Sequence, residues 1–394
     1  MSLSQPSPTR AIVCLAIAGF AGQSMVRVSD TLLPQIAADM ATTVGAASIV
    51  VTAYAFTHSS IQLIVGPIGD RFGKYKTIAI ATALSAIIVL LCGLANSLTT
   101  LALARLASGA TAAWIIPLAI AYVGDVIPYE RRQQVLARFL SGQISGQLFG
   151  QAAGGILGDL IGWRNVFFLL AALFAIAAAA LINELVNNPL TQAQRKSDSN
   201  KSHFISDYAS VLGNPWARII LVAVLIESTL TFGAFTYIGA DLHLRFGLSF
   251  TMVGTVVATF GLGGLLYTVL ANRLVPWLGQ SGLVLYGSII LAVAFVLLAA
   301  EPTWWLAPVA VSAIGLGFYM MHNTLQTNAT QMTPEARGTA VAIFAAALYF
   351  GQTIGVAAAA PIVDRLGAPI VFGIAALGFP ILGFWLSRLL NKKS

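Results

Sequence analysis

The chain has 394 residues, of which 58% are hydrophobic and only 9% are charged. A water-soluble domain has too little interior to bury so much apolar surface, so most of the chain is expected to lie in a lipid bilayer. The formal net charge of +7 does not indicate a nucleic-acid partner, because the basic residues gather in one set of loops between apolar stretches.

Twelve apolar stretches follow one another along the chain, each close to the ~20 residues that a helix needs to cross a bilayer. Their expected bounds are 11–36, 45–68, 75–95, 98–123, 134–158, 163–186, 217–240, 249–271, 281–299, 303–328, 338–361 and 366–388. Backbone groups in lipid must bond internally, and the stretches lack the alternation of a membrane barrel. The sequence therefore predicts an all-α membrane protein with twelve transmembrane helices and no soluble catalytic domain.

The basic residues predict the orientation of these helices. Most Lys and Arg residues fall in loops on one side, whereas the loops on the other side hold only Arg164, Arg245 and Arg365. This positive-inside bias places both termini in the cytoplasm, and we expect a multi-pass protein of a bacterial inner membrane. The first stretch is too long for the core of a signal peptide, so we interpret it as a retained helix.

The sequence contains no pattern typical of a soluble enzyme. His-Glu-x-x-His, Gly-x-Ser-x-Gly and Walker motifs are all missing from it. Cys14 and Cys92 both lie inside apolar stretches, where we interpret them as buried small side chains. We therefore expect no catalytic residue, no metal and no cofactor, and the chain is not expected to be an enzyme.

The chain divides into two similar halves. A polar linker, residues 187–216, separates residues 1–186 from residues 217–394, with six expected helices in each half. A shift of 205 residues aligns motifs of the two halves: Glu130-x-Arg132 with Glu335-x-Arg337, Gly146-Gln147 with Gly351-Gln352, and Asp159 with Asp364. Because the aligned segments share one orientation, we expect parallel repeats about an axis normal to the membrane.

The loop after the second stretch reads Gly-Pro-Ile-Gly-Asp-Arg-Phe-Gly-Lys-Tyr-Lys over residues 66–76. It resembles the signature loop of the major facilitator superfamily, Gly-x-x-x-Asp-Arg-x-Gly-Arg-Lys. We expect Gly66 to allow close helix contact, Gly73 to allow a tight turn, and Asp70 beside Arg71 to form a conformational latch at a helix end. The resemblance implies two six-helix bundles, each with an inverted 3+3 substructure, that alternately open to either side of the membrane.

Three further segments resemble motifs of the drug/sugar:proton antiporter branch of that superfamily. Asp30 with Pro34 is similar to its first-helix motif, and Arg105 matches an intramembrane arginine linked to proton coupling. The fifth stretch resembles the antiporter motif Gly-x-x-x-Gly-Pro-x-x-Gly-Gly but has Gln151 at the proline position. Its glycines recur every four residues, which close helix packing alone explains equally well; they include Gly146, Gly150 and Gly154.

Four charged residues fall inside predicted helices, and their charges sum to zero: Arg27, Asp30, Arg105 and Glu227. Charges in a membrane need partners, because insertion of a lone one costs about 2.5–3.5 kcal/mol. Similar depths along the helices suggest that Asp30 pairs with Arg105, and Arg27 with Glu227 or with substrate. We expect Asp30, Arg105 and Glu227 to couple transport to protons, with Asp30 gaining and losing the proton.

Polar and aromatic residues on the same helices are candidates for a substrate cavity. They are Gln23, Arg27, Tyr54, His58, Trp114, Gln147, Phe235, Tyr319, His322, Asn323 and Gln326. A structural hydrogen bond explains His58 better than a functional role does, while the two readings of His322 and Asn323 stay open.

The leading hypothesis is a secondary transporter that exports small organic molecules in exchange for protons. A proton-coupled importer of a small polar or zwitterionic metabolite uses the same features, and a membrane receptor without transport or an intramembrane enzyme are alternatives of other classes. The expected partners are a small-molecule substrate, protons and the lipid bilayer. One chain already contains both halves, so we expect it to work as a monomer.

Overall fold

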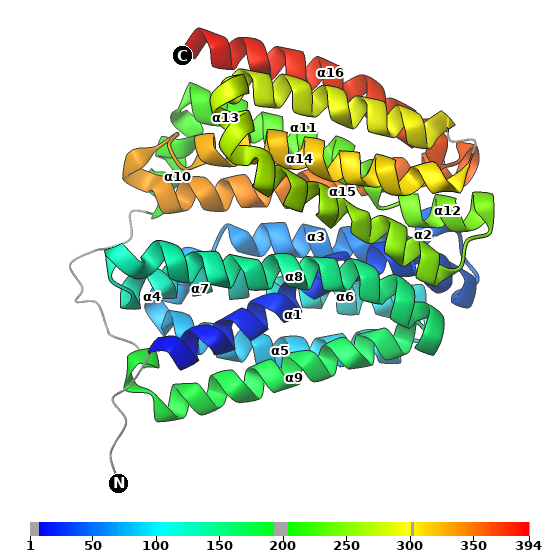
Figure 1. Ribbon diagram of the computed structural model, residues 1–394. Helices are drawn as coiled ribbons and strands as arrows, with labels where there is room; N and C mark the ends of the chain where they lie inside the picture. The colour runs from blue at the N-terminus through cyan, green and yellow to red at the C-terminus, as the bar shows by residue number, and fades with distance from the viewer. Residues whose placement is uncertain (1–7, 193–203, 301–302, 394) are drawn as a thin grey trace.

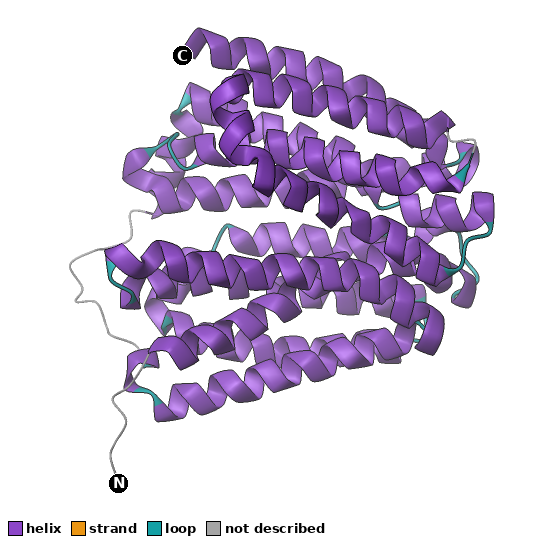
Figure 2. Cartoon of the chain, viewed as in Figure 1, coloured by secondary structure: helices purple, strands orange, loops and turns teal. Residues whose placement is uncertain are grey.

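The computed structural model describes residues 8–192, 204–300 and 303–393. Within these ranges every regular element is helical, and short loops connect the elements (Figure 2). The α-helices are α1 Pro8–Asp39, α2 Val44–Ala47, α3 Ile49–Gln62, α4 Val65–Phe72, α5 Lys74–Leu94, α6 Leu98–Ala112, α7 Ile115–Val126, α8 Tyr129–Ile161, α9 Trp163–Asn187, α10 Phe204–Gly213, α11 Pro215–Phe235, α12 Ile238–Phe246, α13 Phe250–Ala300, α14 Ala307–Ala329, α15 Arg337–Leu366 and α16 Ala368–Lys393. Three 3₁₀ turns accompany them, Pro189–Thr191, Trp304–Leu306 and Pro334–Ala336.

The described helices account for the twelve predicted spans. Ten helical segments are long and apolar enough to cross a membrane. One of them, α13, holds two spans, because its backbone leaves the helical conformation at Gly279 (φ 61°, ψ −177°). The glutamine-containing α8 supplies the remaining span, and its 33 residues are ample for a crossing. The expectation of an all-α protein with twelve transmembrane helices is confirmed.

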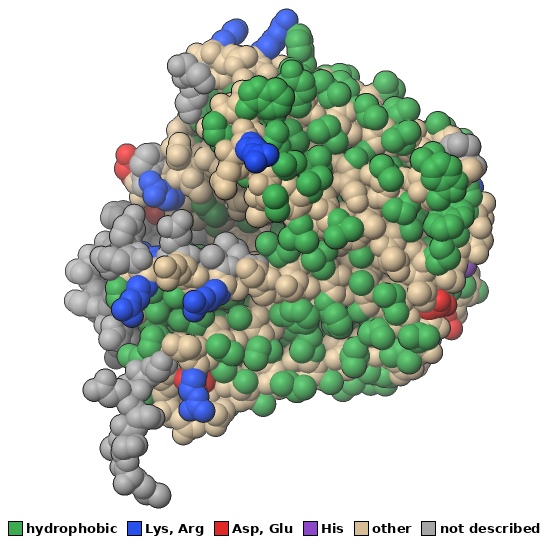
Figure 3. All heavy atoms as spheres, in the orientation of Figure 1, with side chains coloured by type: hydrophobic (Ala, Val, Ile, Leu, Met, Phe, Trp, Pro, Cys, Tyr) green, Lys and Arg blue, Asp and Glu red, His purple; other side chains and the backbone are tan. Residues whose placement is uncertain are grey.

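The helices form two bundles that lie side by side (Figure 1). One bundle consists of α1–α9 and the other of α11–α16. Helix α1 begins and α16 ends at the same end of the molecule, which we call the terminal end. Lys and Arg side chains gather at the terminal end, where the surface is also hollowed between the bundles, and apolar side chains cover the flanks (Figure 3).

The fourth and seventh spans are among those interrupted near the bundle interface. The fourth span divides into α6 and α7 at residues 113–114. Pro117 lies four residues after Ala113 and cannot donate the hydrogen bond that would continue the helix. The seventh span divides into α11 and α12 at Thr236 and Tyr237, where no proline follows within four residues. Thr236, at the interruption of the seventh span, donates a hydrogen bond to Asp30 of α1.

The repeat predicted from the sequence is visible in the packing. A Cβ atom on Gly146 would collide with the carbonyl oxygen of Phe20, so α8 lies directly against α1. The same contact recurs 205 residues later, between Gly351 and Leu225. A second pair of contacts obeys the same shift, Gly150 with Ser24 and Gly355 with Thr229. The glycine stripe of α8, with Gly154 against Val28, is thus a face packed on α1.

The signature loop only partly matches its predicted roles. Gly73 joins α4 to α5 with φ 92°, a conformation that favours glycine, so the predicted tight turn is confirmed. The predicted close contact at Gly66 is wrong, because a Cβ atom there would meet open space. The glycine that does lie against a neighbouring helix is Gly69, which faces Leu118 of α7.

The charged residues of this loop lie at the terminal end. Arg71 is exposed, with its guanidinium 5.6 Å from the ring of Phe72. Lys74 donates to Asp125 at the end of α7, at 2.5 Å, and so ties α5 to α7. The side chain of Asp70 lies outside the described part of the chain, so its predicted role as a latch stays a prediction.

Candidate functional site

A buried charged pair of α1 lies where the two bundles meet. Arg27 Nη1 is 3.4 Å from Asp30 Oδ2, one helical turn away, and both side chains are buried. The other oxygen of Asp30 accepts a hydrogen bond from Thr236 of the opposite bundle, at 3.2 Å. The guanidinium of Arg27 lies 3.7 Å from the ring centroid of Phe232, also in the opposite bundle. These contacts therefore connect the charged pair of α1 directly to the opposite bundle.

The predicted pairing of Asp30 with Arg105 is wrong in this conformation. Arg105 is fully buried, and its guanidinium donates to two backbone carbonyls, those of Val50 and Met25, at 3.0 and 3.3 Å. It also lies 4.3 Å from the ring centroid of Tyr54. Arginine suits this position because its rigid guanidinium can donate to several acceptors at once. Arg105 here connects α6 to α1 and α3 within one bundle.

The predicted pairing of Arg27 with Glu227 is also replaced by another contact. Glu227 of α11 is fully buried, and its Oε2 atom lies 2.9 Å from Nδ1 of His322 on α14. Its second oxygen has no hydrogen-bond partner among the described residues. The ring of His322 is stacked on Phe318, with centroids 4.8 Å apart. Asp30 and Glu227 thus each have a basic partner within their own bundle, Arg27 and His322 respectively.

A row of packed side-chain rings continues the interface toward the terminal end. Tyr54 stacks on His58 of the same helix, with centroids 5.5 Å apart. His58 in turn lies 4.3 Å from the ring centroid of Tyr349 on α15 of the opposite bundle. The Tyr54 hydroxyl and the Nδ1 atom of His58 are buried without a hydrogen-bond partner in the described chain. Buried polar atoms of this kind are costly unless a ligand, a water or another conformation satisfies them.

Polar amides of α8 face the opposite bundle at mid-depth. Gln147 and Gln151 line a cavity of about 30 Å³ together with Phe260 of α13 and Tyr319 of α14. Gln151 is fully buried, and both atoms of its amide group lack a partner among the described residues. A cavity of this size holds about one water molecule, so the space is too small for a substrate in this conformation.

The remaining predicted residues do not all reach this interface. Phe235 is buried in a cluster of rings, 4.9 Å from Phe260. Gln23 and Trp114 are half-buried, as is Asn323, and Gln326 is exposed. No described contact joins these last four to the charged pairs. The structure therefore brings together only part of the predicted cavity lining.

Several interface residues were missed by the sequence reasoning. Phe232 contacts Arg27 and lies at the position that the 205-residue shift aligns with it, so the repeat offered a signal for this contact. Thr236 and Tyr349 offered none, because threonine and tyrosine in an apolar helix are ordinary. Their roles depend on which helices face each other across the interface.

The end of the interface opposite the terminal end is closed by two related hydrogen-bonded groups. Asp159, at the end of α8, accepts from the backbone N–H and the hydroxyl of Thr251 at the start of α13, at 3.1 and 2.6 Å. Asp364, at the end of α15, accepts from the Gly45 N–H at 2.8 Å and from the Thr43 hydroxyl at 2.6 Å. Each carboxylate thus bonds the N-terminal turn of a helix in the other bundle, where the helix dipole favours an anion.

Comparison with known proteins identifies the relatives of this chain. The sequence profile described as Major Facilitator Superfamily matches residues 13–356. The uncharacterized MFS-type transporter YceJ of Bacillus subtilis is 26% identical over 356 residues, covering 87% of this chain and 86% of its own. A probable sugar efflux transporter of Pasteurella multocida is 23% identical, covering 97% and 92%.

A solved structure has the same fold. That of the POT family transporter PepTSo superposes with a TM-score of 0.76 and covers 98% of both chains at 14% identity. The profile match covers most of the chain, and the two-bundle architecture agrees with it. The chain is therefore a multi-pass membrane protein that belongs to the major facilitator superfamily.

Proposed function

We propose that this protein is a secondary active transporter that exports small organic molecules in exchange for protons by alternating access. The proposal depends most on one observation, the contact of the buried Arg27–Asp30 pair with Thr236 and Phe232 across the bundle interface. The name of the Pasteurella relative, a probable sugar efflux transporter, supports export as the direction. The relatives give no support to a receptor without transport.

The orientation follows from the basic residues. Lys and Arg gather at the terminal end, so we propose that this end faces the cytoplasm of a bacterial inner membrane. The conformation described here is then closed toward the outside by Asp159 and Asp364. Its hollow between the bundles opens toward the cytoplasm (Figure 3).

Asp30 is the proposed proton carrier because its hydrogen bond crosses the interface that must separate. It is 2% exposed, and one of its oxygens bonds Thr236 of the other bundle. We expect this carboxylate to meet water when α1 and α11 part. Protonation would remove its attraction to Arg27 and free that guanidinium, and the same event would weaken the link between the bundles. Charge and conformation are therefore coupled at one residue.

Glu227 and His322 are proposed as a second titratable site in the other bundle. Their contact lies at the bundle core, and the unbonded oxygen of Glu227 is available to a substrate or a proton. Arg105 is proposed to act on Asp30 only through the position of α1, because it donates to the Met25 carbonyl of that helix. The amides of Gln147 and Gln151 are proposed to bind substrate when the interface opens, since the Gln151 side chain is buried with no hydrogen-bond partner among the described residues.

The proposal is tested with the full chain in sealed liposomes. A thermal-shift screen first selects a compound from a panel of neutral sugars and the cationic dye Hoechst 33342. Flux of that compound is then measured with an imposed pH gradient in each direction. Equilibrium exchange of the compound across the liposome membrane is measured without a pH gradient. We expect Asp30→Asn to lose the gradient-driven flux by at least tenfold while equilibrium exchange continues.

The matched control is Asp39→Asn, which removes a carboxylate from the same helix at an exposed position. It should keep the gradient-driven flux. Undiminished gradient-driven flux in Asp30→Asn would refute the proton-carrier assignment. Substrate moving in the same direction as protons would show an importer instead of an exporter, and saturable binding without any accumulation would contradict transport itself.

A further inference from the structure

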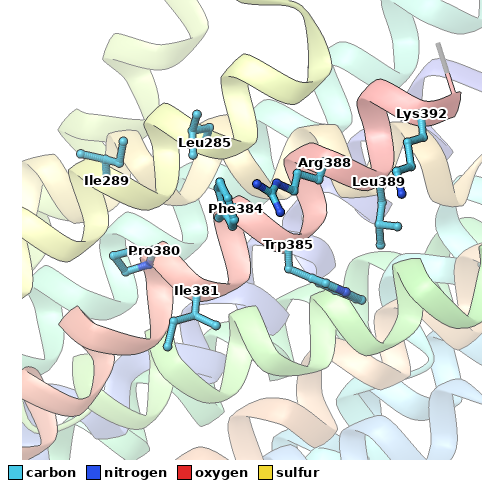
Figure 4. A pocket seen from close by; sticks show the side chains of 9 residues that line it. All are labelled: Leu285, Ile289, Pro380, Ile381, Phe384, Trp385, Arg388, Leu389 and Lys392. Atoms are coloured by element: carbon cyan, nitrogen blue, oxygen red, sulfur yellow. The ribbon is translucent and has the colours of Figure 1, made fainter.

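A groove opens on the lipid-facing side of the C-terminal bundle, between α16 and residues 280–300 of α13 (Figure 4). Its volume is about 730 Å³. Leu285 and Ile289 of α13 form one wall, and Ile381 and Phe384 of α16 form the other. The groove lies on the outside of the bundle, away from the interface at which transport is proposed.

The packing of the two helices explains why the groove exists. A Cβ atom on Gly383 would collide with the hydroxyl of Ser288, so α16 and α13 approach each other closely there. The residues next to this contact are large, and two of them, Ile381 and Phe384, are 71% and 51% exposed. Because the two backbones are close at Gly383 while the neighbouring side chains protrude, a groove remains along the helix pair.

The length of the groove matches one leaflet of a bilayer. It extends from Pro380, halfway along α16, to Lys392 at the end of that helix. Twelve residues of α-helix rise about 18 Å, and half of a hydrocarbon core is about 15 Å thick. In the proposed orientation the groove therefore runs from the bilayer midplane to the headgroups of the cytoplasmic leaflet.

The charged end of the groove lies at headgroup depth. The guanidinium of Arg388 is 3.9 Å from the ring centroid of Phe384, which holds it over the groove. Lys392 follows one turn later and is exposed. No carboxylate of the described residues pairs with either cation in the structure. Trp385 lies beside them and is partly exposed, as is typical of tryptophan at a membrane interface.

We propose that this groove is a binding site for an anionic phospholipid of the cytoplasmic leaflet. One acyl chain lies along the apolar walls, and the phosphate group lies between Arg388 and Lys392. Two cations that pair with no described carboxylate, at the end of an apolar groove, favour a lipid with net negative charge, because a zwitterionic headgroup carries a cation of its own. The site depends on the proposed orientation of the chain but not on any substrate or on proton coupling.

Fluorescence quenching tests this lipid preference directly. A variant that keeps Trp385 and replaces the other six tryptophans by phenylalanine is reconstituted into phosphatidylcholine bilayers with increasing amounts of brominated phosphatidylglycerol. We expect brominated phosphatidylglycerol to associate near Trp385 more strongly than brominated phosphatidylcholine does. The association constant should be higher by roughly fivefold for each cation. Arg388→Gln combined with Lys392→Gln should abolish this preference.

Two controls separate the groove from general surface charge. Lys76→Gln removes an exposed cation from the same end of the molecule and should keep the preference. A variant with Trp305 as its single tryptophan, which is 60% exposed just before the start of α14, should show no preference. Equal quenching by the two lipids at Trp385, or a preference that survives the double substitution, would overturn the proposal.

A second measurement does not depend on the tryptophan substitutions. Native mass spectrometry of the otherwise unaltered protein compares bound phosphatidylglycerol in the parent and in the Arg388→Gln/Lys392→Gln variant. The parent is expected to retain one lipid that the variant loses, and equal retention would contradict the site. Neither assay involves flux, so the lipid site and the proposed transport can fail independently.

Discussion

Arg105 shows how one residue of a predicted motif can hold a helix bundle together. Its guanidinium is fully buried, donates to carbonyls of two other helices and lies against Tyr54. Both carbonyls lie inside helices and keep their helical hydrogen bonds, so loss of the guanidinium removes two charge-assisted bonds and the packing of a fully buried side chain. In this conformation the geometry favours a structural role for Arg105 over a direct exchange of charge with Asp30.

Replacement of Arg105 by alanine should therefore destabilise the fold. We expect the free energy of unfolding to fall by about 3 kcal/mol, because two charged hydrogen bonds are lost together. Arg105→Lys should recover part of this loss, since it keeps the charge but not the rigid geometry of the donors. Reversible denaturation of the purified protein in mixed micelles measures both values. Unchanged stability in Arg105→Ala would contradict the structural role.

At the scale of elements, two helix pairs repeat one packing arrangement. Helix α8 lies on α1 through Gly146 and Gly150, and α15 lies on α11 through the aligned glycines. Within a membrane, apolar side chains gain little by leaving lipid for another helix, so close backbone approach supplies much of the association. The glycine face of α8 thus has a structural function that is independent of antiport.

Alanine at these glycines is expected to disrupt both helix pairs. Gly150→Ala and Gly355→Ala each place a methyl group on a carbonyl of the neighbouring helix, and should lower the free energy of unfolding by about 1–3 kcal/mol. Gly66→Ala is the matched control, because its Cβ atom meets open space. Its stability should be unchanged or slightly raised. The same denaturation experiment compares the three variants, and equal effects would contradict this packing argument.

At the scale of the whole molecule, Asp159 and Asp364 hold one end closed. The two carboxylates occupy aligned positions in the repeat, and each bonds the start of a helix in the opposite bundle. Both bonds must break when that end opens. The pair therefore contributes to the balance between the two conformations that alternating access requires.

Removal of both carboxylates should shift that balance. A charge at a helix N-terminus contributes about 1 kcal/mol, so Asp159→Ala with Asp364→Ala should raise the ratio of open to closed molecules by roughly thirtyfold. Spin labels at Leu94 and Leu244, exposed on different bundles at this end, report the opening as a longer distance. Asp39→Ala is the control, because Asp39 pairs with Arg164 inside one bundle. An unchanged distance distribution in the double variant would contradict the closing role.

The fold could be predicted from the sequence further than the site could. The first helix was expected over 11–36 and extends from Pro8 to Asp39, and Gly73 makes the expected turn. In contrast, the predicted pair of Asp30 and Arg105 depended on depth alone, and in the structure Asp30 contacts Arg27 and Thr236 instead. Depth along a helix fixes one coordinate of a side chain, whereas its partner also depends on how each helix is rotated and placed.

The sequence by itself determined that most of the chain lies in lipid, that it is helical and that its two halves are repeats. Long apolar stretches must be helical because lipid offers no hydrogen bonds to the backbone, and a repeated sequence packs by repeated contacts. Only the tertiary structure decided which charges meet, which end is closed and where a lipid-facing groove opens. These features arise between segments far apart in the chain, as with Asp30 and Thr236 or Asp159 and Thr251, so no local pattern records them.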